Sequence, residues 1–228
     1  KLFVADDLPD EVAQAYREHL QFAADLWGNF GPLEVWIMGS DSDALARQHE
    51  QWCQQRLSWG IGFKSTDCEQ QRSNNYWPLG DYLDIATQAL ESGRPMQNAC
   101  RCGMGQYGFH LMMASAPWGF FKDSPFADWR GDGFDTTPAH EYWHILHFSH
   151  LSNKDEAGNR RGGNADPTLG GPGWFIEGSA VYMANIALTK QILSGYVSVH
   201  GELRSECFEC EMKAQMTRGL EARSQNPG

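Results

Sequence analysis

This 228-residue chain lacks several features, and each absence argues against a class of protein. No apolar run approaches the roughly 20 residues of a membrane-spanning helix, so we expect no transmembrane segment. Basic residues are scarce, with 18 Lys and Arg against 29 Asp and Glu, and a net charge of −11 argues against nucleic acid as a partner. No Asn-x-Ser/Thr sequon occurs, which fits a bacterial product. The chain begins at Lys1 and shows no signal-like segment, so we expect a mature or trimmed product.

Six cysteines are present in this acidic, tryptophan-rich sequence: Cys53, Cys68, Cys100, Cys102, Cys207 and Cys210. An even number suggests disulfides and an oxidising compartment, so we expect a secreted, periplasmic or cell-surface protein. Cys53 and Cys68 are a plausible local pair. The other four cysteines could cross-link to one another or form a four-cysteine zinc site. Fully reduced thiols are a further alternative.

Hydrophobic periodicity predicts helices over 9–27, 42–57 and 81–91, and strands over 33–38 and 106–114. The second of these strands precedes a histidine-rich segment. It could lie at the edge of a sheet, where the backbone of a peptide substrate could pair with it through main-chain hydrogen bonds, or it could be an ordinary core strand.

Four of the eight histidines fall within the eleven residues 140–150, and this run contains the motif H-E-x-x-H. Positions i and i+4 of a helix share one face, so His140 and His144 can aim two imidazoles at one metal ion. Glu141 is next to the first of them, where it can take a proton from a zinc-bound water whose pKa falls to about 7. The alternative is a buried helix whose histidines only satisfy hydrogen bonds, but burying several imidazoles without a shared purpose has a polar cost.

A catalytic zinc site usually has three protein ligands, and the sequence offers two candidates for the third. Glu177 begins a nearly continuous apolar helix after a glycine-rich loop, where a carboxylate needs a partner of opposite charge or a favourable helix dipole. His150 occupies the third histidine position of the metzincin pattern H-E-x-x-H-x-x-G-x-x-H, although His147 replaces its glycine. That glycine lets the chain leave the helix sharply, so its replacement disfavours His150.

The motif His140-Glu141-x-x-His144, followed by Trp174-x-x-Glu177-Gly178-x-Ala180-x-Tyr182, resembles the gluzincin metallopeptidases. These are the thermolysin-like and aminopeptidase-like members of the peptidase MA-like superfamily. The resemblance covers roughly residues 134–185. It implies that zinc is the cofactor and that its ligands are His140, His144 and Glu177.

The same resemblance implies the catalytic groups. Glu141 would be the general base of peptide-bond hydrolysis. In gluzincins a tyrosine or histidine steadies the oxyanion, and Tyr196 and His200 are the candidates here by position alone.

We therefore expect one α+β zincin-like domain over residues 1–228, with a small, mostly antiparallel sheet and two core helices that bear the zinc ligands. Residues 1–130 would supply the sheet, and residues 131–228 the ligand helices and further C-terminal helices. The expected function is zinc-dependent hydrolysis of a peptide or protein substrate. A non-proteolytic metal-dependent hydrolase and an inactive binding domain are the alternatives. The sequence leaves the oligomeric state open.

Overall fold

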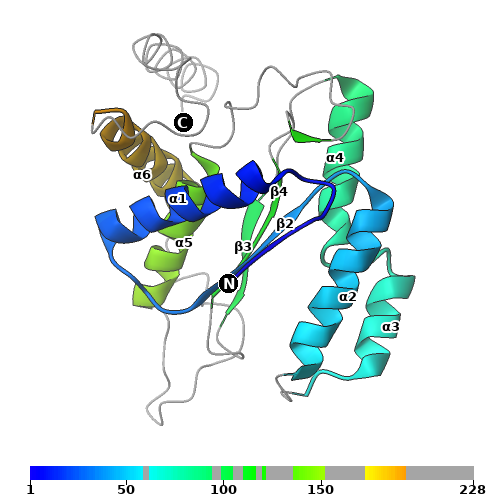
Figure 1. The fold of residues 1–228 in the computed structure, drawn as a ribbon. Helices are drawn as coiled ribbons and strands as arrows, with labels where there is room; N and C mark the ends of the chain where they lie inside the picture. The colour runs from blue at the N-terminus through cyan, green and yellow to red at the C-terminus, as the bar shows by residue number, and fades with distance from the viewer. Residues whose placement is uncertain are drawn as a thin grey trace.

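The computed structural model describes residues 1–58, 62–93, 99–104, 110–116, 120–121, 136–151 and 173–193. Within this part of the chain, a sheet lies between two groups of helices (Figure 1). The strands are β1 (Leu2–Val4), β2 (Leu33–Met38), β3 (Ala99–Met104) and β4 (His110–Ser115). The helices are α1 (Asp10–Trp27), α2 (Ser42–Ser58), α3 (Ser65–Ser73), α4 (Gly80–Ser92), α5 (Thr137–Leu151) and α6 (Gly173–Leu193).

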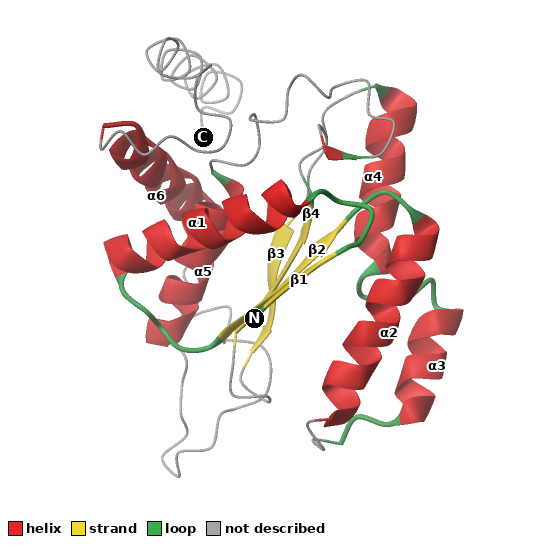
Figure 2. Ribbon diagram, viewed as in Figure 1, coloured by secondary structure: helices red, strands yellow, loops and turns green. Residues whose placement is uncertain are grey.

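The sheet has the strand order β1-β2-β4-β3. β1, β2 and β4 run parallel, and β3 alone runs antiparallel to its neighbour β4. The expectation of a mostly antiparallel sheet is therefore wrong. The strands can run parallel because long crossover segments connect them, as parallel neighbours require. Helix α1 joins β1 to β2, and the segment containing α2, α3 and α4 lies between β2 and β4 in the chain (Figure 2).

Of the two positions considered for the strand over 106–114, the structure rules out the sheet edge and shows a core strand. Its described part belongs to β4, which pairs with β2 on one side and β3 on the other and so lies inside the sheet. Every residue of β4 is buried, as is typical of a strand covered on both faces. Among the described strands, β1 and β3 form the edges of the sheet.

The side chains on the two faces of the sheet belong to different core clusters, because successive side chains of a strand point to opposite faces. Val35 and Ile37 of β2 belong to a core cluster with α1 and α5, which also includes alanines of α2 and α4. Trp36 and Met38 belong to a second cluster with α2, α3 and α4. Helix α5, which contains the H-E-x-x-H motif, therefore packs on the same side of the sheet as α1.

The predicted helices over 9–27, 42–57 and 81–91 correspond to α1, α2 and α4, and the strand over 33–38 corresponds to β2. No pattern in the sequence predicted β1, α3 or β3. No helix in the described ranges has the length and apolarity needed to span a membrane. The expected C-terminal helices lie outside the described residues.

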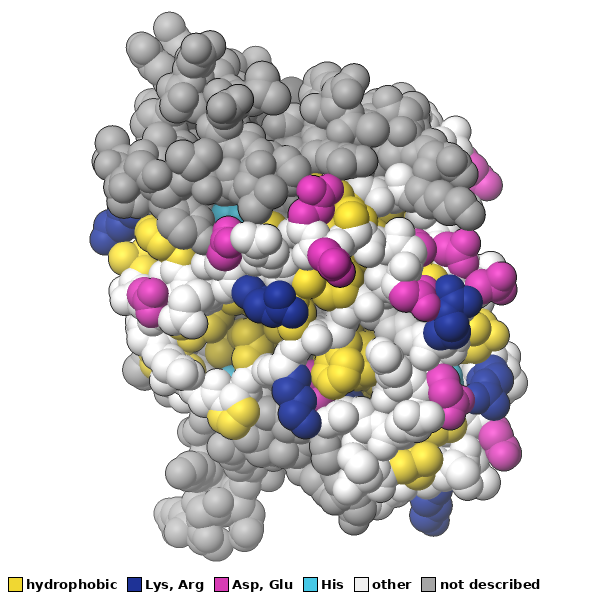
Figure 3. Space-filling view, in the orientation of Figure 1, with side chains coloured by type: hydrophobic (Ala, Val, Ile, Leu, Met, Phe, Trp, Pro, Cys, Tyr) yellow, Lys and Arg dark blue, Asp and Glu magenta, His cyan; other side chains and the backbone are white. Residues whose placement is uncertain are grey.

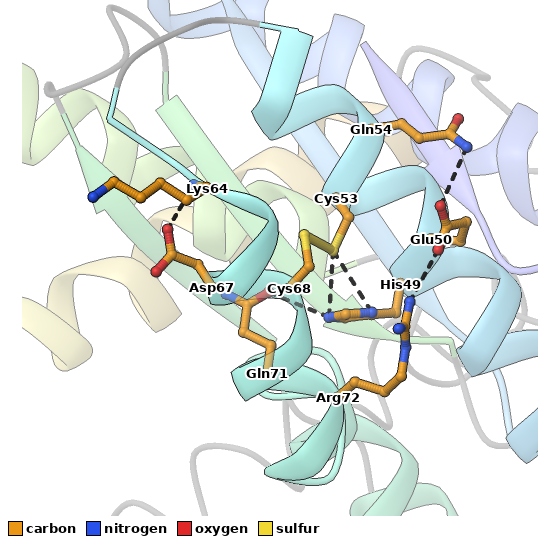
Figure 4. The surroundings of a disulfide bond; sticks show 9 residues. All are labelled: His49, Glu50, Cys53, Gln54, Lys64, Asp67, Cys68, Gln71 and Arg72. Atoms are coloured by element: carbon orange, nitrogen blue, oxygen red, sulfur yellow. Dashed lines mark hydrogen bonds and ion pairs between the residues drawn. A yellow bond between two sulfur atoms is a disulfide. The ribbon is translucent and has the colours of Figure 1, made fainter.

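A disulfide joins Cys53 of α2 to Cys68 of α3, which confirms the predicted local pair. Cys68 is the only buried residue of α3, whose sequence is otherwise polar. The Sγ atom of Cys53 lies 3.8 Å from both ring nitrogens of His49 (Figure 4). The disulfide therefore supplies the buried anchor by which α3 is attached to α2.

Candidate metal centre

Helix α5 presents the motif histidines from a firmly packed position. It begins at Thr137, and the His140 N–H donates to the carbonyl of Thr136 at 2.8 Å. Two residues further along the helix, the hydroxyl of Tyr142 donates to the carbonyl of Gly28 at 2.8 Å. Tyr142 and Ile145 are both buried in the core shared with α1 and β2. The face with His140 and His144 is thus fixed relative to the sheet.

The structure brings the three predicted ligands together. The Nε2 atoms of His140 and His144 lie 3.0 Å apart. The Oε2 atom of Glu177, from α6, lies 3.3 Å from the first nitrogen and 3.5 Å from the second. One ligand atom from each of the three residues lies within 4.8 Å of the others, so this cluster could hold a metal ion.

The separations within the cluster can be tested against a real coordination sphere. Bonds of about 2.0–2.1 Å from a tetrahedral zinc place any two ligand atoms roughly 3.3 Å apart. The three separations, 3.0, 3.3 and 3.5 Å, scatter around this value. Two imidazole nitrogens and one carboxylate oxygen are also the donor set of many catalytic zinc sites, with one coordination position left open. The residues therefore fit a divalent cation of this kind.

The electrostatic environment favours the metal-binding form of His140. Burial lowers the pKa of its imidazole, and the nearby Glu177 carboxylate opposes this shift. The ring is therefore neutral at neutral pH and keeps a lone pair for a cation. His144 is more deeply buried than His140, whereas the side chain of Glu177 is 65% exposed. The cluster is thus accessible from the side of α6.

Glu141 lies beside the cluster but is not one of its ligands. It is buried, and its Oε1 atom lies 4.0 Å from the Nε2 atom of His140. Burial raises the pKa of Tyr82 on α4, and the negative charge of Glu141 raises it further. No motif in the sequence points to Tyr82, which lies within the helix predicted over 81–91.

No protein-family model, curated protein or solved structure matches this chain. The similarity to gluzincins therefore remains a prediction that rests on the motif residues. The candidate metal centre rests instead on the positions of its three side chains.

The backbone of α5 bears on the alternative third ligand, His150. Helix α5 continues through Leu151 without a break at His147, where the metzincin pattern requires the chain to turn. The structure thus favours Glu177. Tyr196 and His200, the candidates for oxyanion stabilisation, lie outside the described residues.

Exposed apolar side chains surround the ligand from α6. Trp174 and Val181 lie three residues before and four residues after Glu177, so they flank it on the same helix face. Both are exposed, as are Phe175 and Tyr182. Phe175 also contacts His147 of α5, with ring centroids 6.0 Å apart and perpendicular rings. An apolar surface therefore borders the accessible side of the cluster.

A separate groove of about 970 Å³ lies between α1 and the start of the strands (Figure 3). Its lining includes Leu20, Leu33 and Tyr142, but none of the three candidate ligands. Tyr142 is two residues after His140 and so points from roughly the opposite side of α5. This groove is therefore not the opening of the metal centre.

Proposed function

We propose that this protein is a zinc-dependent peptidase in which His140, His144 and Glu177 hold the metal and Glu141 is the general base. The observation that supports it most is the cluster of three donor atoms at separations typical of a tetrahedral site, with a buried carboxylate beside it. Zinc, when bound, supplies a Lewis acid that polarises the scissile carbonyl and acidifies water.

The chain itself supplies the proton transfer. The Glu141 carboxylate accepts a proton from the attacking water and passes it to the nitrogen of the leaving amine. Its burial next to His140 supports this role, because a general base must lie within reach of the reacting water. A proton is thus moved from nucleophile to leaving group without a net change in Glu141.

A peptide substrate is supported by two surfaces near the cluster. β3 is an edge strand that packs against α5, and an extended peptide can add to such an edge through main-chain hydrogen bonds. The apolar residues of α6 that flank Glu177 favour a substrate with apolar side chains. The disulfide between Cys53 and Cys68 supports a secreted, periplasmic or cell-surface location.

The proposal is tested in two steps with the purified chain. Elemental analysis should find one zinc per chain, and anomalous scattering at the zinc edge should place it between the three ligands. Mass spectrometry should then detect cleavage of a random peptide mixture by the wild type and strongly reduced cleavage by Glu141→Gln. A chain that binds no metal would overturn the metal centre. A zinc-loaded wild type that leaves every peptide intact would overturn the peptidase assignment alone.

A further inference from the structure

Glu177 must be positioned by something other than its own burial. It is largely exposed, and so are Trp174 and Phe175, which precede it in the first turn of α6. The first fully buried residue of the helix is Ala180. Apolar burial therefore holds α6 mainly beyond the ligand, and in the ligand's own turn the described apolar contact is that of the Phe175 ring with His147.

Further along α6, small side chains let the helix approach α5 closely. Ala184 and Ala187 form a buried cluster with Ala139, which immediately precedes the first motif histidine. This contact brings the two helices together but leaves few directional constraints, because alanine side chains offer no hydrogen bond. The helix could still rotate or slide by a few tenths of an ångström, which is enough to misplace a metal ligand.

A chain of two hydrogen bonds ties the ligand-bearing turn to α5. The indole Nε1–H of Trp143 donates to Oγ of Ser179 at 3.1 Å, and that hydroxyl donates to the carbonyl of Ile176 at 3.0 Å. Ile176 is the residue directly before Glu177. Trp143 lies between the two motif histidines in α5, and its ring meets the ring of Trp27 edge-on at 5.3 Å between centroids. The donor is therefore itself held by α1.

We propose that Trp143 and Ser179 are positioning residues for the third metal ligand. Their hydrogen bond sets the orientation of the first turns of α6 and so presents the Glu177 carboxylate to His140 and His144. This inference rests on the metal centre of the proposed function, but it does not depend on peptide cleavage. It predicts that the affinity for zinc depends on a side chain that does not touch the metal.

The test measures zinc affinity of the full chain by competition with a chromogenic chelator. Ser179→Ala and Trp143→Phe should each weaken zinc binding about 5–10-fold, the effect of losing one hydrogen bond. Ser179→Thr keeps the hydroxyl and should retain the wild-type affinity. Thr189→Val is the matched control, because the Thr189 hydroxyl donates to the carbonyl of Asn185 within the same helix. It should leave zinc affinity unchanged.

A double-mutant cycle separates positioning from general loosening of the fold. If Ser179 acts through Glu177, then Ser179→Ala should cause no further loss of zinc affinity in a Glu177→Ala background. Wild-type affinity in Ser179→Ala, or the same loss with and without Glu177, would overturn the inference while the metal centre stands. A wild-type chain that binds no zinc would instead overturn the metal centre and the inference together.

Discussion

The Oε2 atom of Glu177 lies 3.3 Å from the Nε2 atom of His140, although the two residues come from different helices and differ in exposure. His140 and His144 are placed together by one turn of α5. The carboxylate joins them only because α6 packs against α5. Local helix geometry therefore supplies two donors, and tertiary structure supplies the third.

Removal of the third donor should weaken metal binding without unfolding the protein. We expect Glu177→Gln to lower zinc affinity by at least the ~10–100-fold typical of losing an outer-shell partner, because a direct ligand is lost. The carboxylate is exposed, so the urea midpoint of the metal-free chain should change little. Glu50→Gln, which alters an exposed carboxylate on α2, is the control and should bind zinc as the wild type does. Equal affinity in Glu177→Gln would place the third ligand elsewhere.

Glu141 should matter for turnover and not for metal binding. We expect Glu141→Gln to reduce peptide cleavage by about 10²–10⁴-fold, the range for loss of a general acid–base group. Zinc content and zinc affinity should stay at the wild-type level, because the carboxylate is not one of the clustered donors. A variant that loses its zinc would show that Glu141 supports the metal, and its activity would then say nothing about proton transfer.

The three residues of the candidate metal cluster could be predicted because each has a recognisable pattern in the local sequence. His140 and His144 have helical spacing, and Glu177 stands out as a carboxylate in an apolar run. The direction of the sheet could not be predicted in this way. β1 has only three residues, which is too short for a periodic pattern. Its parallel pairing with β2 could therefore not be recognised. The bond between Trp143 and Ser179 was missed because it joins two helices whose relative position only the fold defines.

The disulfide should contribute measurably to stability. Cys53 and Cys68 are 15 residues apart, and closing a loop of this length stabilises a protein by about 3 kcal/mol in the chain-entropy estimate. We expect Cys53→Ala/Cys68→Ala to lower the free energy of unfolding by about 2–3 kcal/mol in urea titrations. Because Cys68 is the buried anchor of α3, trypsin should also cut faster after Lys64 and Arg72. Cleavage after Arg17 of α1 is the internal control, and uniform acceleration at all sites would contradict a local role.

Acidification should destabilise the metal-free protein. Burial lowers the pKa of His49, His140 and His147 below the ordinary value of 6.5. The unfolded chain therefore binds more protons than the folded chain between 6.5 and the lower folded-state pKa values. The free energy of unfolding is fully retained above 6.5 and falls as the pH drops through this window.

His49 offers the cleanest check of this pH dependence, because it lies beside the disulfide and away from the metal centre. Unfolding free energies should be measured in urea at several pH values on both sides of 6.5. His49→Gln removes one titrating group, so its profile should fall less steeply on acidification than that of the wild type. Parallel profiles would show that His49 keeps its ordinary pKa in the folded state.

A buried ion pair beside the second core cluster should contribute to stability, because each of its charges is neutralised by the other. Nη2 of Arg56 lies 2.7 Å from Oε1 of Glu34, and both side chains are almost completely buried. The same oxygen accepts a hydrogen bond from Trp36 Nε1 at 2.6 Å. The Arg56 guanidinium also lies over the ring of Trp52, 3.6 Å from its centroid. The loss of either partner would leave a charge in the core.

We expect Arg56→Met to lower the free energy of unfolding by about 3–5 kcal/mol, because Glu34 would remain buried without its cation. The double variant Glu34→Gln/Arg56→Met should recover much of this loss, since neither charge is then left alone. Arg72→Met is the matched control: its partner Glu50 is exposed, so the change should be about 0–1 kcal/mol. Equal losses in the single and double variants would mean that Arg56 stabilises the core through its contact with Trp52 and not through its charge.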